Sequence, residues 1–359
     1  MATGDPRTNL IVIFGGQSAE HDVSCTSAAH VIRAADPSRY RVVPIGIGRD
    51  GRWSLATSVA DALESGPDAL PPRLDPSGTI VEPSLAITPP DAAPTVVFPL
   101  LHGPMGEDGT MQGLLELAGL PYVGPGVLSS ALAMDKSMAK LVAEQHHIPQ
   151  ARHVSLRAHE VGPSTPQRLA DELGLPVFVK PANMGSSIGI SKARTLEQVR
   201  DALTLAAEYD EYLIVEEAVA GREIEVAVLG NLEPRASLPG EVVPGADFYD
   251  YADKYVDDGS RTLIPAPLTD AQTAEVRALA IRAYTAMRCD GMARVDFFLE
   301  EGAPDAPGRG FLLNEVNTIP GFTPISMYPK MWIASGLSYP ALIDELVALA
   351  LERHARRHR

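Results

Sequence analysis

The fold is decided by residues 291–323, which read GMARVDFFLEEGAPDAPGRGFLLNEVNTIPGFT. This stretch contains two hydrophobic runs, 293–299 and 310–313, separated by a segment rich in Gly and Pro. Apolar runs of this length, bounded by turn residues, are typical of buried β-strands. The sequence therefore predicts a pair of strands joined by a turn.

Three polar side chains interrupt or follow these strands. Asp296 lies inside the first apolar run, whereas Glu315 and Asn317 follow the second and lie two residues apart, so both point to one face of an extended segment. Three oxygen ligands on one sheet surface favour a hard divalent cation, which prefers carboxylate and amide oxygens to imidazole or thiolate. In the alternative interpretation Asp296 pairs with Arg294, Glu315 is solvated and no metal binds, but Asn317 then has no explanation.

Composition sets the limits for the whole chain. A length of 359 residues predicts two or three domains with separate cores. The 45% hydrophobic and 21% charged residues are ordinary for a soluble globular protein. A net charge of -16 and a pI near 5.0 argue against nucleic acid as a partner, because binding its backbone needs a basic face. A phosphorylated small molecule would need a few local Lys residues, backbone N–H groups and metal ions.

The ends of the chain and its cysteines indicate a cytoplasmic protein. Cys25 and Cys289 are far apart, which predicts neither a disulfide framework nor a CxxC metal site. Residues 1–9 lack the apolar core of a signal peptide, and no apolar run approaches membrane-spanning length, so no membrane association is expected. The basic residues 353–359 follow an amphipathic helix, 339–351, and we expect a solvated helix end there.

The N-terminal segment has the pattern of a βαβ unit. An apolar strand, 9–14, runs into a double glycine and then a helix, 25–34. This arrangement brings Glu20 to the carboxyl edge of an open α/β sheet, where ligands collect, although Glu20 could instead be a first-turn acid that complements the helix dipole. Further strands are expected at 40–47 and 95–100. Residues 65–94, rich in Pro, Asp and Ala, predict a surface excursion.

A glycine-dense loop, LHGPMGEDGTMQG at 101–113, follows the third of these strands. Loops at strand ends often carry function. A lone His102 would more often be structural than chemical. Because two acidic residues lie beside it at a strand end, the structural and the chemical interpretation are equally supported.

A second domain begins just before a helix that runs from about residue 134 to 145. The elements that follow are predicted as strand 152–156, helix 166–173 and strand 177–180. Lys180 then stands directly before a small, flexible segment, 181–190. A point charge beside a Gly/Ser turn suits a nucleotide phosphate, although no Walker loop is present and a plain hairpin turn is the alternative.

The third part of the chain contains a long segment without periodicity. Helix 195–208 and strand 212–215 precede it, and a domain boundary falls before strand 224–229. Residues 244–267 carry several Tyr and Asp residues and few aliphatic ones. This composition predicts a mobile lid over an active site. Helix 270–287 then leads back to the hairpin.

Taken together, these motifs closely resemble one family, the D-alanine–D-alanine ligases of the ATP-grasp superfamily. The resemblance covers nearly the whole chain. Six motifs stand in the family's order: GGQSAEHDVS, HGPMGEDGTMQG, KPANMGSSIGI, YDYADKY, ARVDFF and NEVNTIPGFT. Each is weak alone, and their combination is specific.

The resemblance implies an α/β fold of three domains, with an N-terminal open parallel sheet and ATP held between the sheets of the second and third. The implied domains are 1–133, 134–223 and 224–359, with the lid at 244–267. The implied activity joins two D-alanine molecules to D-alanyl-D-alanine through an acylphosphate, releasing ADP and phosphate, for peptidoglycan precursor synthesis. A homodimer is usual for such ligases. Substrate chirality is implied by the resemblance alone.

The resemblance also assigns a nucleotide and metal site. Residues for ATP are Lys136 and Lys180 at the phosphates, Glu216, Glu217 and Val219 at the adenine, Glu223 at the ribose, and Lys254 in the lid. Asp296, Glu315 and Asn317 would hold two Mg²⁺ or Mn²⁺ ions that bridge the phosphates.

The remaining implied residues surround the two amino acids. Glu20 would receive the ammonium of the first D-alanine, with Ser186 and Tyr255 closing the lid over it. Arg294 and the Gly321 N–H would face the developing oxyanion. Ser326, with Met327, would meet the carboxylate of the second D-alanine.

Two rival hypotheses stay open. The chain could be a relative that makes another bond, such as the D-alanyl-D-lactate ester, or a nucleotide-binding regulatory protein without turnover. Tyr255 speaks against the first, because ester-forming relatives usually carry another residue there. The full set of metal and oxyanion residues speaks against the second.

Overall fold

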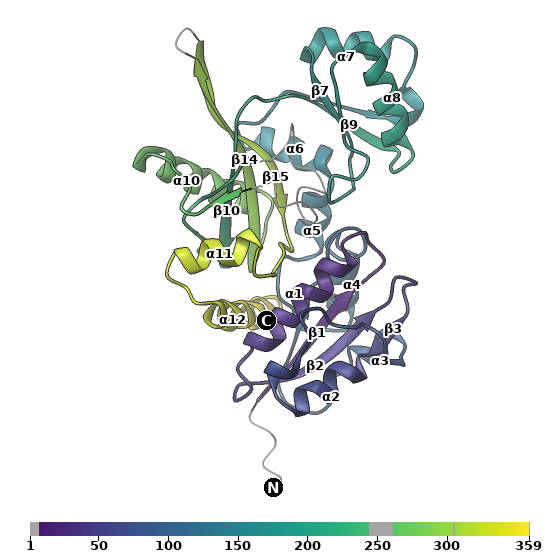
Figure 1. Ribbon diagram of the computed structural model, residues 1–359, viewed down its shortest axis with the longest axis vertical. Coiled ribbons are helices and arrows are strands. Elements are labelled where there is room, and N and C mark those ends of the chain that lie inside the picture. The colour runs from purple at the N-terminus through teal and green to yellow at the C-terminus, as the bar shows by residue number, and fades with distance from the viewer. Residues whose placement is uncertain (1–6, 244–260, 304–305, 359) are drawn as a thin grey trace.

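The computed structural model describes residues 7–243, 261–303 and 306–358. Three sheets follow one another along the chain and give the molecule an elongated shape (Figure 1). This confirms the predicted α/β class. Most of the predicted lid, with Lys254 and Tyr255, lies outside the described residues.

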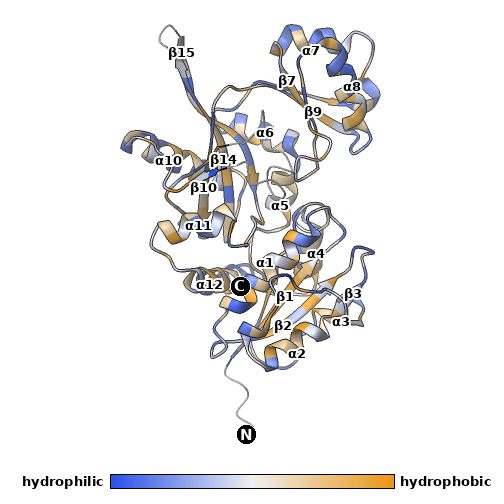
Figure 2. Ribbon diagram, viewed as in Figure 1, coloured by the Kyte–Doolittle hydropathy of each residue, from blue (hydrophilic) through white to orange (hydrophobic). Residues whose placement is uncertain are grey.

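The N-terminal sheet has the strand order β4-β3-β2-β1-β5; β2, β1 and β5 are parallel, and β3 and β4 add to the sheet in antiparallel pairs. The strands are β1 (Thr8–Gly15), β2 (Tyr40–Ile47), β3 (Trp53–Leu55), β4 (Thr79–Ile80) and β5 (Thr95–Pro99). Seven of the eight residues of β1 are buried, as expected for a parallel strand covered on both faces. Figure 2 shows β1 and β2 as largely apolar.

Helices cover this sheet. They are α1 (His21–Ala34), α2 (Thr57–Glu64), α3 (Pro83–Ala86) and α4 (Thr110–Leu117), with the short η1 (Pro67–Ala69). The predicted excursion at 65–94 is mostly exposed, but it also supplies β4 to the sheet edge and buries Leu70 and Leu74 in the core.

The central sheet has the order β6-β9-β7-β8. Its strands are β6 (His153–Arg157), β7 (Val177–Pro181), β8 (Ser191–Ala193) and β9 (Tyr212–Glu217), all antiparallel to their neighbours. Helices α7 (Thr165–Leu173) and α8 (Leu196–Ala207) pack on it and form a small core of their own. In Figure 1 this lobe stands apart from the N-terminal sheet.

The third sheet has the order β13-β12-β10-β14-β15, with β11 beside β10. Its strands are β10 (Arg222–Leu229), β11 (Arg235–Ala236), β12 (Gly240–Val243), β13 (Arg261–Leu263), β14 (Met292–Ala303) and β15 (Ala306–Asn317). Helix α10 (Asp270–Ala286) packs against it, and so does α6 (Lys136–Gln145), which follows α5 (Val127–Met134) and buries Ala139 and Ala143 in the same core.

The hairpin of β14 and β15 is longer than the sequence predicted. The predicted strand at 310–313 covers only part of β15, because the polar residues 314–317 were placed after the strand. They remain within the ladder, where Glu315 pairs with Asp296 and Asn317 with Arg294, and a β-bulge follows Asp296. A β-bulge changes the direction in which nearby side chains point. The polar residues that interrupt the apolar pattern are therefore part of the strands themselves.

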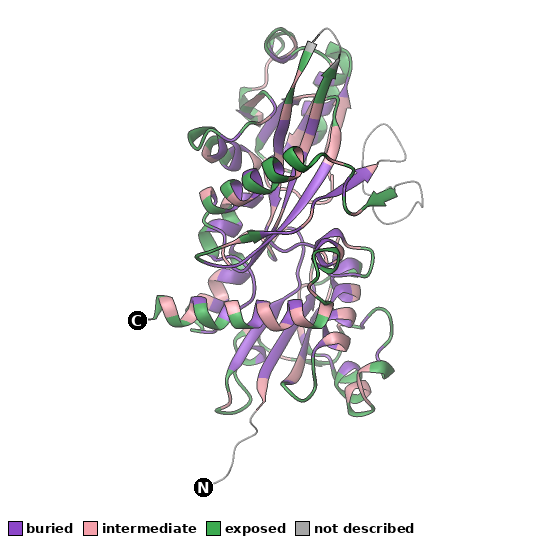
Figure 3. Cartoon of the chain, turned by 90° about the vertical axis from the view of Figure 1, so that its left-hand side faces the viewer, coloured by how far each residue is buried: buried purple, intermediate pink, exposed green. Residues whose placement is uncertain are grey.

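The C-terminal helices join the N-terminal and C-terminal sheets. Helix α11 (Met327–Ala334) and helix α12 (Tyr339–Arg357) follow the hairpin, and α12 crosses between the two sheets (Figure 3). One hydrophobic core contains residues of both β1 and α12, such as Phe14 and Leu346.

The prediction of a solvated basic tail is wrong at Arg353, while Arg357 and His358 are exposed. Arg353 is only 3% exposed, its Nη1 donates to the Gly124 carbonyl at 2.6 Å, and its guanidinium lies 4.0 Å from the centre of the Tyr122 ring. Arg356 and Arg357 form ion pairs with Asp290 and Glu116. The helix continues past residue 351 because these contacts hold its last turns against the N-terminal domain and against Asp290, which precedes β14.

Among the described residues, no single helix is long and apolar enough to cross a membrane; only α11 and α12 together pass that test, and they are bent by 106°.

Candidate active site

A cavity of about 560 Å³ lies where the three parts of the chain meet. Every predicted site residue that the structure describes lines it, and the set comes from all three sheets. These residues are Glu20, Lys136, Lys180, Ser186, Glu216, Glu217, Val219, Glu223, Arg294, Asp296, Glu315, Asn317, Gly321 and Ser326. The sequence motifs, together with the family resemblance that they carry, therefore identified residues that line one cavity.

The three oxygen-bearing side chains of the hairpin meet at one point. Asp296 on β14 and Glu315 on β15 are direct partners across the ladder. The Asn317 amide nitrogen lies 2.9 Å from Asp296 Oδ2 and 3.4 Å from Glu315 Oε1. We call Asp296, Glu315 and Asn317 the acidic trio. Turning the Asn317 amide over would present a third oxygen, so the donor set suits a hard divalent cation.

Arg294 borders the acidic trio. Its Nε and Nη2 donate to the two oxygens of Asp296 at 2.8 and 2.7 Å, and Nε also lies 3.1 Å from Glu225 Oε2. The pairing of Arg294 with Asp296 belonged to the interpretation without metal, yet here it coexists with the gathered oxygens. Burial opposes the charge, but the neighbouring carboxylates raise the Arg294 pKa well above its ordinary value, so a fixed cation faces the cavity.

A second cluster lies at the other end of the cavity. Glu216 on β9 accepts from Lys140 Nζ at 2.7 Å through Oε1 and from Lys180 Nζ through Oε2. We call Lys136, Lys140, Lys180 and Glu216 the lysine cluster. Burial alone would favour the protonated acid, but the two ammonium groups overcome it and hold the Glu216 pKa well below its usual range.

Lys136 and Lys140 both come from α6 and stand four residues apart, on one helix face. Lys136 Nζ donates to the Met184 carbonyl at 2.6 Å, at the loop between β7 and β8. Burial, its largest influence, lowers the Lys136 pKa. Sequence reasoning identified Lys136 and missed Lys140, although the four-residue spacing was a usable signal.

The loop between β7 and β8 crosses the cavity near Glu20. It is a hairpin connection, as the alternative interpretation had it, and it also reaches the site. Ser186 and Ser187 adopt left-handed backbone conformations, with φ of 50° and 59°. A Cβ at Gly185 would lie 3.2 Å from Glu20 Oε2, so the backbone approaches that carboxylate closely. Ser186 Oγ is buried and has no hydrogen-bond partner among the described residues.

The glycine-dense loop supplies two further titratable groups. His102 is 5% exposed, and its Nδ1 lies 2.9 Å from the Ile319 carbonyl oxygen. Desolvation lowers the His102 pKa, so the ring is neutral at pH 7. Glu107 accepts the Gly103 N–H at 2.7 Å. Desolvation first, and then the charge of Glu20, raise the Glu107 pKa to about 8.

Gly321 and Ser326 lie together beside Thr323. Ser326 Oγ accepts from the Thr323 N–H at 3.0 Å and lies 2.8 Å from its hydroxyl. A Cβ at Gly321 would lie only 2.8 Å from Ser326 Oγ, so a side chain there would displace the hydroxyl. Glycine keeps this corner of the cavity open.

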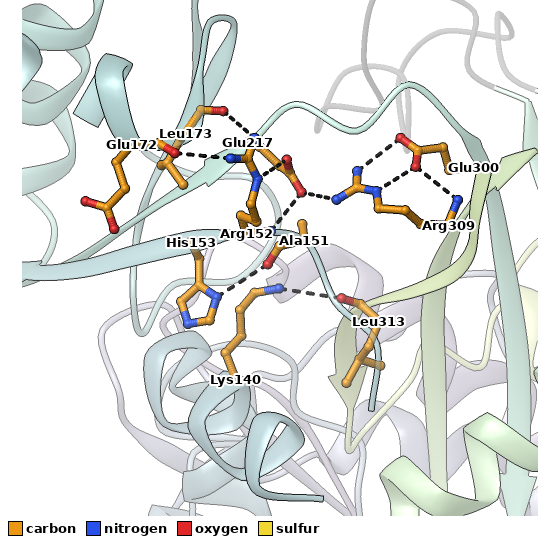
Figure 4. Close-up of polar contacts among 10 residues, drawn as sticks. All are labelled: Lys140, Ala151, Arg152, His153, Glu172, Leu173, Glu217, Glu300, Arg309 and Leu313. Carbon is orange, nitrogen blue, oxygen red and sulfur yellow. Dashed lines mark hydrogen bonds and ion pairs between the residues drawn. The ribbon is translucent and has the colours of Figure 1, made fainter. Parts of the chain in front are cut away.

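The carboxylate of Glu217 is bound differently from that of Glu216. Arg152 donates to it through its backbone N–H and Nε, each at 2.8 Å, and Arg309 donates to it and to Glu300 (Figure 4). We call these four residues the arginine bridge. It joins the central sheet to the hairpin of β14 and β15, because Arg152 precedes β6 and Arg309 lies in β15. The Glu217 side chain is therefore already engaged by two guanidinium groups.

The central and C-terminal sheets enclose a cavity that has lysines at one end and carboxylates at the other. The chain has the ATP-grasp fold, which it shares with solved ligase structures. Residues 9–125 match the family model described as D-ala D-ala ligase N-terminus, and residues 142–348 match D-ala D-ala ligase C-terminus. The chain belongs to the D-alanine–D-alanine ligase family and is a ligase.

Relatives with this name match along nearly their full length. The D-alanine–D-alanine ligase of Clostridium acetobutylicum is 46% identical over 354 residues, which span 97% of this chain and 99% of that protein. The D-alanine–D-alanine ligase of Mycolicibacterium vanbaalenii is 46% identical over 372 residues, or 97% and 98% of the two chains.

Solved structures are similar too. The D-alanine-D-alanine ligase from Coxiella burnetii has a TM-score of 0.80 and 37% identity, covering 98% of this chain and 96% of that one. The VanG D-Ala:D-Ser ligase from Enterococcus faecalis has a TM-score of 0.79 and 34% identity, covering 96% and 99%. The family thus includes a member named for a different second amino acid.

Proposed function

We propose that this chain joins two D-alanine molecules into D-alanyl-D-alanine at the expense of ATP, for peptidoglycan precursor synthesis. One observation carries the proposal: a cluster of lysines, a trio of oxygen ligands and the Glu20 carboxylate line a single cavity. Joining a carboxylate to an amine in water is uphill, so the carboxylate must first become an acylphosphate. That step needs phosphate binding and charge neutralisation in one place.

The nucleotide would lie between the central and C-terminal sheets. Lys136 and Lys180 supply cations for the phosphates, while Glu216, Glu217 and Val219 border the adenine and Glu223 the ribose. Lys254 would complete this set from the lid. Since Glu217 is held in the arginine bridge, its contribution to the adenine slot comes through its backbone.

The acidic trio would hold Mg²⁺ or Mn²⁺ between itself and the phosphates. Its fit is supported by the convergence of two carboxylates and an amide from paired strands. When bound, such ions neutralise charge on the transferring phosphoryl group. Arg294 holds Asp296 in place from the side and leaves the Glu315 carboxylate facing the cavity.

The amino acids would bind on the N-terminal side. Glu20 pairs with the ammonium of the first D-alanine, and Ser186 with Tyr255 covers it. An acylphosphate hydrolyses if it is wet, so the lid excludes water. Attack by the second amine creates a tetrahedral oxyanion, which the Arg294 guanidinium and the Gly321 N–H stabilise. Ser326 receives the second carboxylate.

The identity of the second substrate is the open choice within this family. A relative that makes the D-alanyl-D-lactate ester is the alternative, and the VanG relative is named for D-serine. Tyr255 favours D-alanine. We also propose that the protein is a homodimer with the domain division 1–133, 134–223 and 224–359. We place it in the cytoplasm, because the buried, unpaired Cys25 and Cys289 fit a reducing compartment.

Parallel measurements of phosphate release test the proposal. ATP and Mg²⁺ are supplied with D-alanine, L-alanine, D-serine or D-lactate, and D-alanine is expected to give the fastest release with D-alanyl-D-alanine as product. Release that is equal with L-alanine, or fastest with D-lactate, would contradict it.

Glu315→Gln tests the metal assignment in the same assay. The change removes one carboxylate from the acidic trio and keeps the volume, so turnover should fall by about 100-fold or more while the fold persists. Near-wild-type turnover at saturating Mg²⁺ would exclude this role. Circular dichroism serves as the control for folding.

A further inference from the structure

The proposed phosphate contacts use Lys136 and Lys180 of the lysine cluster and leave Lys140 without a role. Glu216 carries one ammonium group on each carboxylate oxygen, Lys140 on Oε1 and Lys180 on Oε2. If Lys180 turns from Glu216 toward a phosphate, its contact with Oε2 is lost. The buried carboxylate then depends on Lys140 alone.

The two lysines differ in their freedom to leave. The Lys140 side chain is 4% exposed, and its Nζ also lies 3.5 Å from the Leu313 carbonyl oxygen on β15. The Lys180 side chain is 12% exposed and stands at the end of β7, where the loop to β8 begins. Lys136, one helical turn before Lys140, already lies at that loop. Lys140 is therefore the fixed cation and Lys180 the movable one.

We propose that Lys140 is a positioning residue that keeps Glu216 in place as a charged acceptor while Lys180 exchanges from Glu216 Oε2 to the phosphates of ATP. The proposal rests on the proposed function, which places adenine beside Glu216 and phosphates beside Lys180. The exchange frees Oε2 to accept a hydrogen from the adenine amine. Arrival of the phosphates thereby prepares recognition of the base.

This exchange predicts that the two ends of the nucleotide do not bind independently. Adenosine has no phosphate to draw Lys180 away, so Lys180 stays on Oε2 and the adenine amine does not reach that oxygen. The phosphates of ATP draw Lys180 away themselves. Lys140 matters little for adenosine, because Lys180 then remains on Glu216, and matters much for ATP, because Glu216 is otherwise left as an unpaired buried charge.

The test uses matched substitutions at the two oxygens of one carboxylate, Lys140→Met and Lys180→Met. Calorimetry with Mg²⁺ measures binding of adenosine and of a non-hydrolysable imido analogue of ATP. For Lys140→Met we expect a loss of about 30-fold or more for the analogue, since stranding a buried charge is costly, and about 3-fold or less for adenosine. For Lys180→Met we expect tighter adenosine binding and weaker analogue binding.

Two further variants separate positioning from a merely structural role. Lys140→Arg keeps the charge and should restore most of the analogue affinity. The double variant Lys140→Met, Glu216→Gln removes the stranded charge, so it should bind the analogue more tightly than Lys140→Met alone. Thermal unfolding of each variant identifies any that does not fold, and the double variant then carries the test.

The outcomes are distinct. Equal losses for adenosine and analogue in Lys140→Met, or no loss in either, would overturn the exchange. Weaker adenosine binding in Lys180→Met would do the same. If the wild-type chain binds no ATP analogue at all, the proposed function itself fails.

Discussion

Two carboxylates that line the same cavity, Glu216 and Glu107, differ in their ionisation. At the nucleotide end two lysines hold the Glu216 pKa well below its usual range. At the opposite end, desolvation and the neighbouring Glu20 raise the Glu107 pKa to about 8. At pH 7 the first is an anion and the second carries a proton. The same residue type thus serves two purposes because its neighbours differ.

The two ends of the cavity therefore differ in charge. The lysine cluster is net cationic and suits phosphates. Near the N-terminal loop, a protonated Glu107 contributes no negative charge. Three substitutions test whether the contrast is real, and they are arranged from the largest expected effect to the smallest.

Glu216→Gln should have the largest effect on stability. It leaves Lys140, which is nearly inaccessible to water, without its counter-charge, and breaking one side of a buried ion pair costs about 3–5 kcal/mol. Urea denaturation without ligands measures the loss. A change below about 1 kcal/mol would mean that water reaches this cluster, because surface pairs contribute only that much.

Glu107→Gln should alter the pH dependence of stability. Because the folded pKa of Glu107 is raised, the unfolded chain releases this proton first, so the group stabilises the fold at low pH and this stabilisation is lost as pH rises from about 4.5 towards 8. The variant lacks that loss, so its stability relative to wild type should increase with pH, by at most about 1.4 kcal/mol per pH unit.

Denaturation at pH 5, 6.5 and 8, with EDTA and without substrates, measures this trend. Gln keeps an oxygen that accepts the Gly103 N–H, so a change in stability does not come from loss of this hydrogen bond. A stability difference that stays constant across this range would show that Glu107 is ionised throughout.

Glu217→Gln is the matched control for Glu216→Gln and should have the smallest effect. It changes the next residue of the same strand, but the arginines that bind it are 59% and 40% exposed. Solvent screens such pairs, so we expect a loss of about 1 kcal/mol or less, smaller still at 1 M salt. Urea denaturation at low and high salt measures it. A loss as large as that of Glu216→Gln would make the arginine bridge a principal support between the sheets.

The sequence was sufficient to find site residues that lie within one short segment or at the end of one strand. Asp296, Glu315 and Asn317 break the pattern of one hairpin, and Lys180 ends one strand, so local periodicity was enough to find them. Strands β1, β2 and β5 of the N-terminal sheet were located from their apolar residues, whereas the short strands β3 and β4 were not predicted.

What could not be predicted depends on residues brought together from distant segments. The partner of Lys140 lies 76 positions downstream, and an amphipathic helix explains a lysine on its surface equally well. Glu107 owes its raised pKa to burial and to Glu20, neither of which the loop motif reveals. Arg353 was placed in solvent because a basic helix end is usually solvated, whereas Tyr122 and Gly124 provide it with a buried site.

The core shared by β1 and α12 has a consequence for biosynthesis. Phe14 leaves the ribosome long before Leu346 and Arg353, which complete the packing around the N-terminal sheet. A nascent chain must keep that apolar surface exposed until α12 has been made. Termination of translation before α12 would therefore leave this face of the N-terminal domain uncovered, so an early segment depends on a much later one for protection from aggregation.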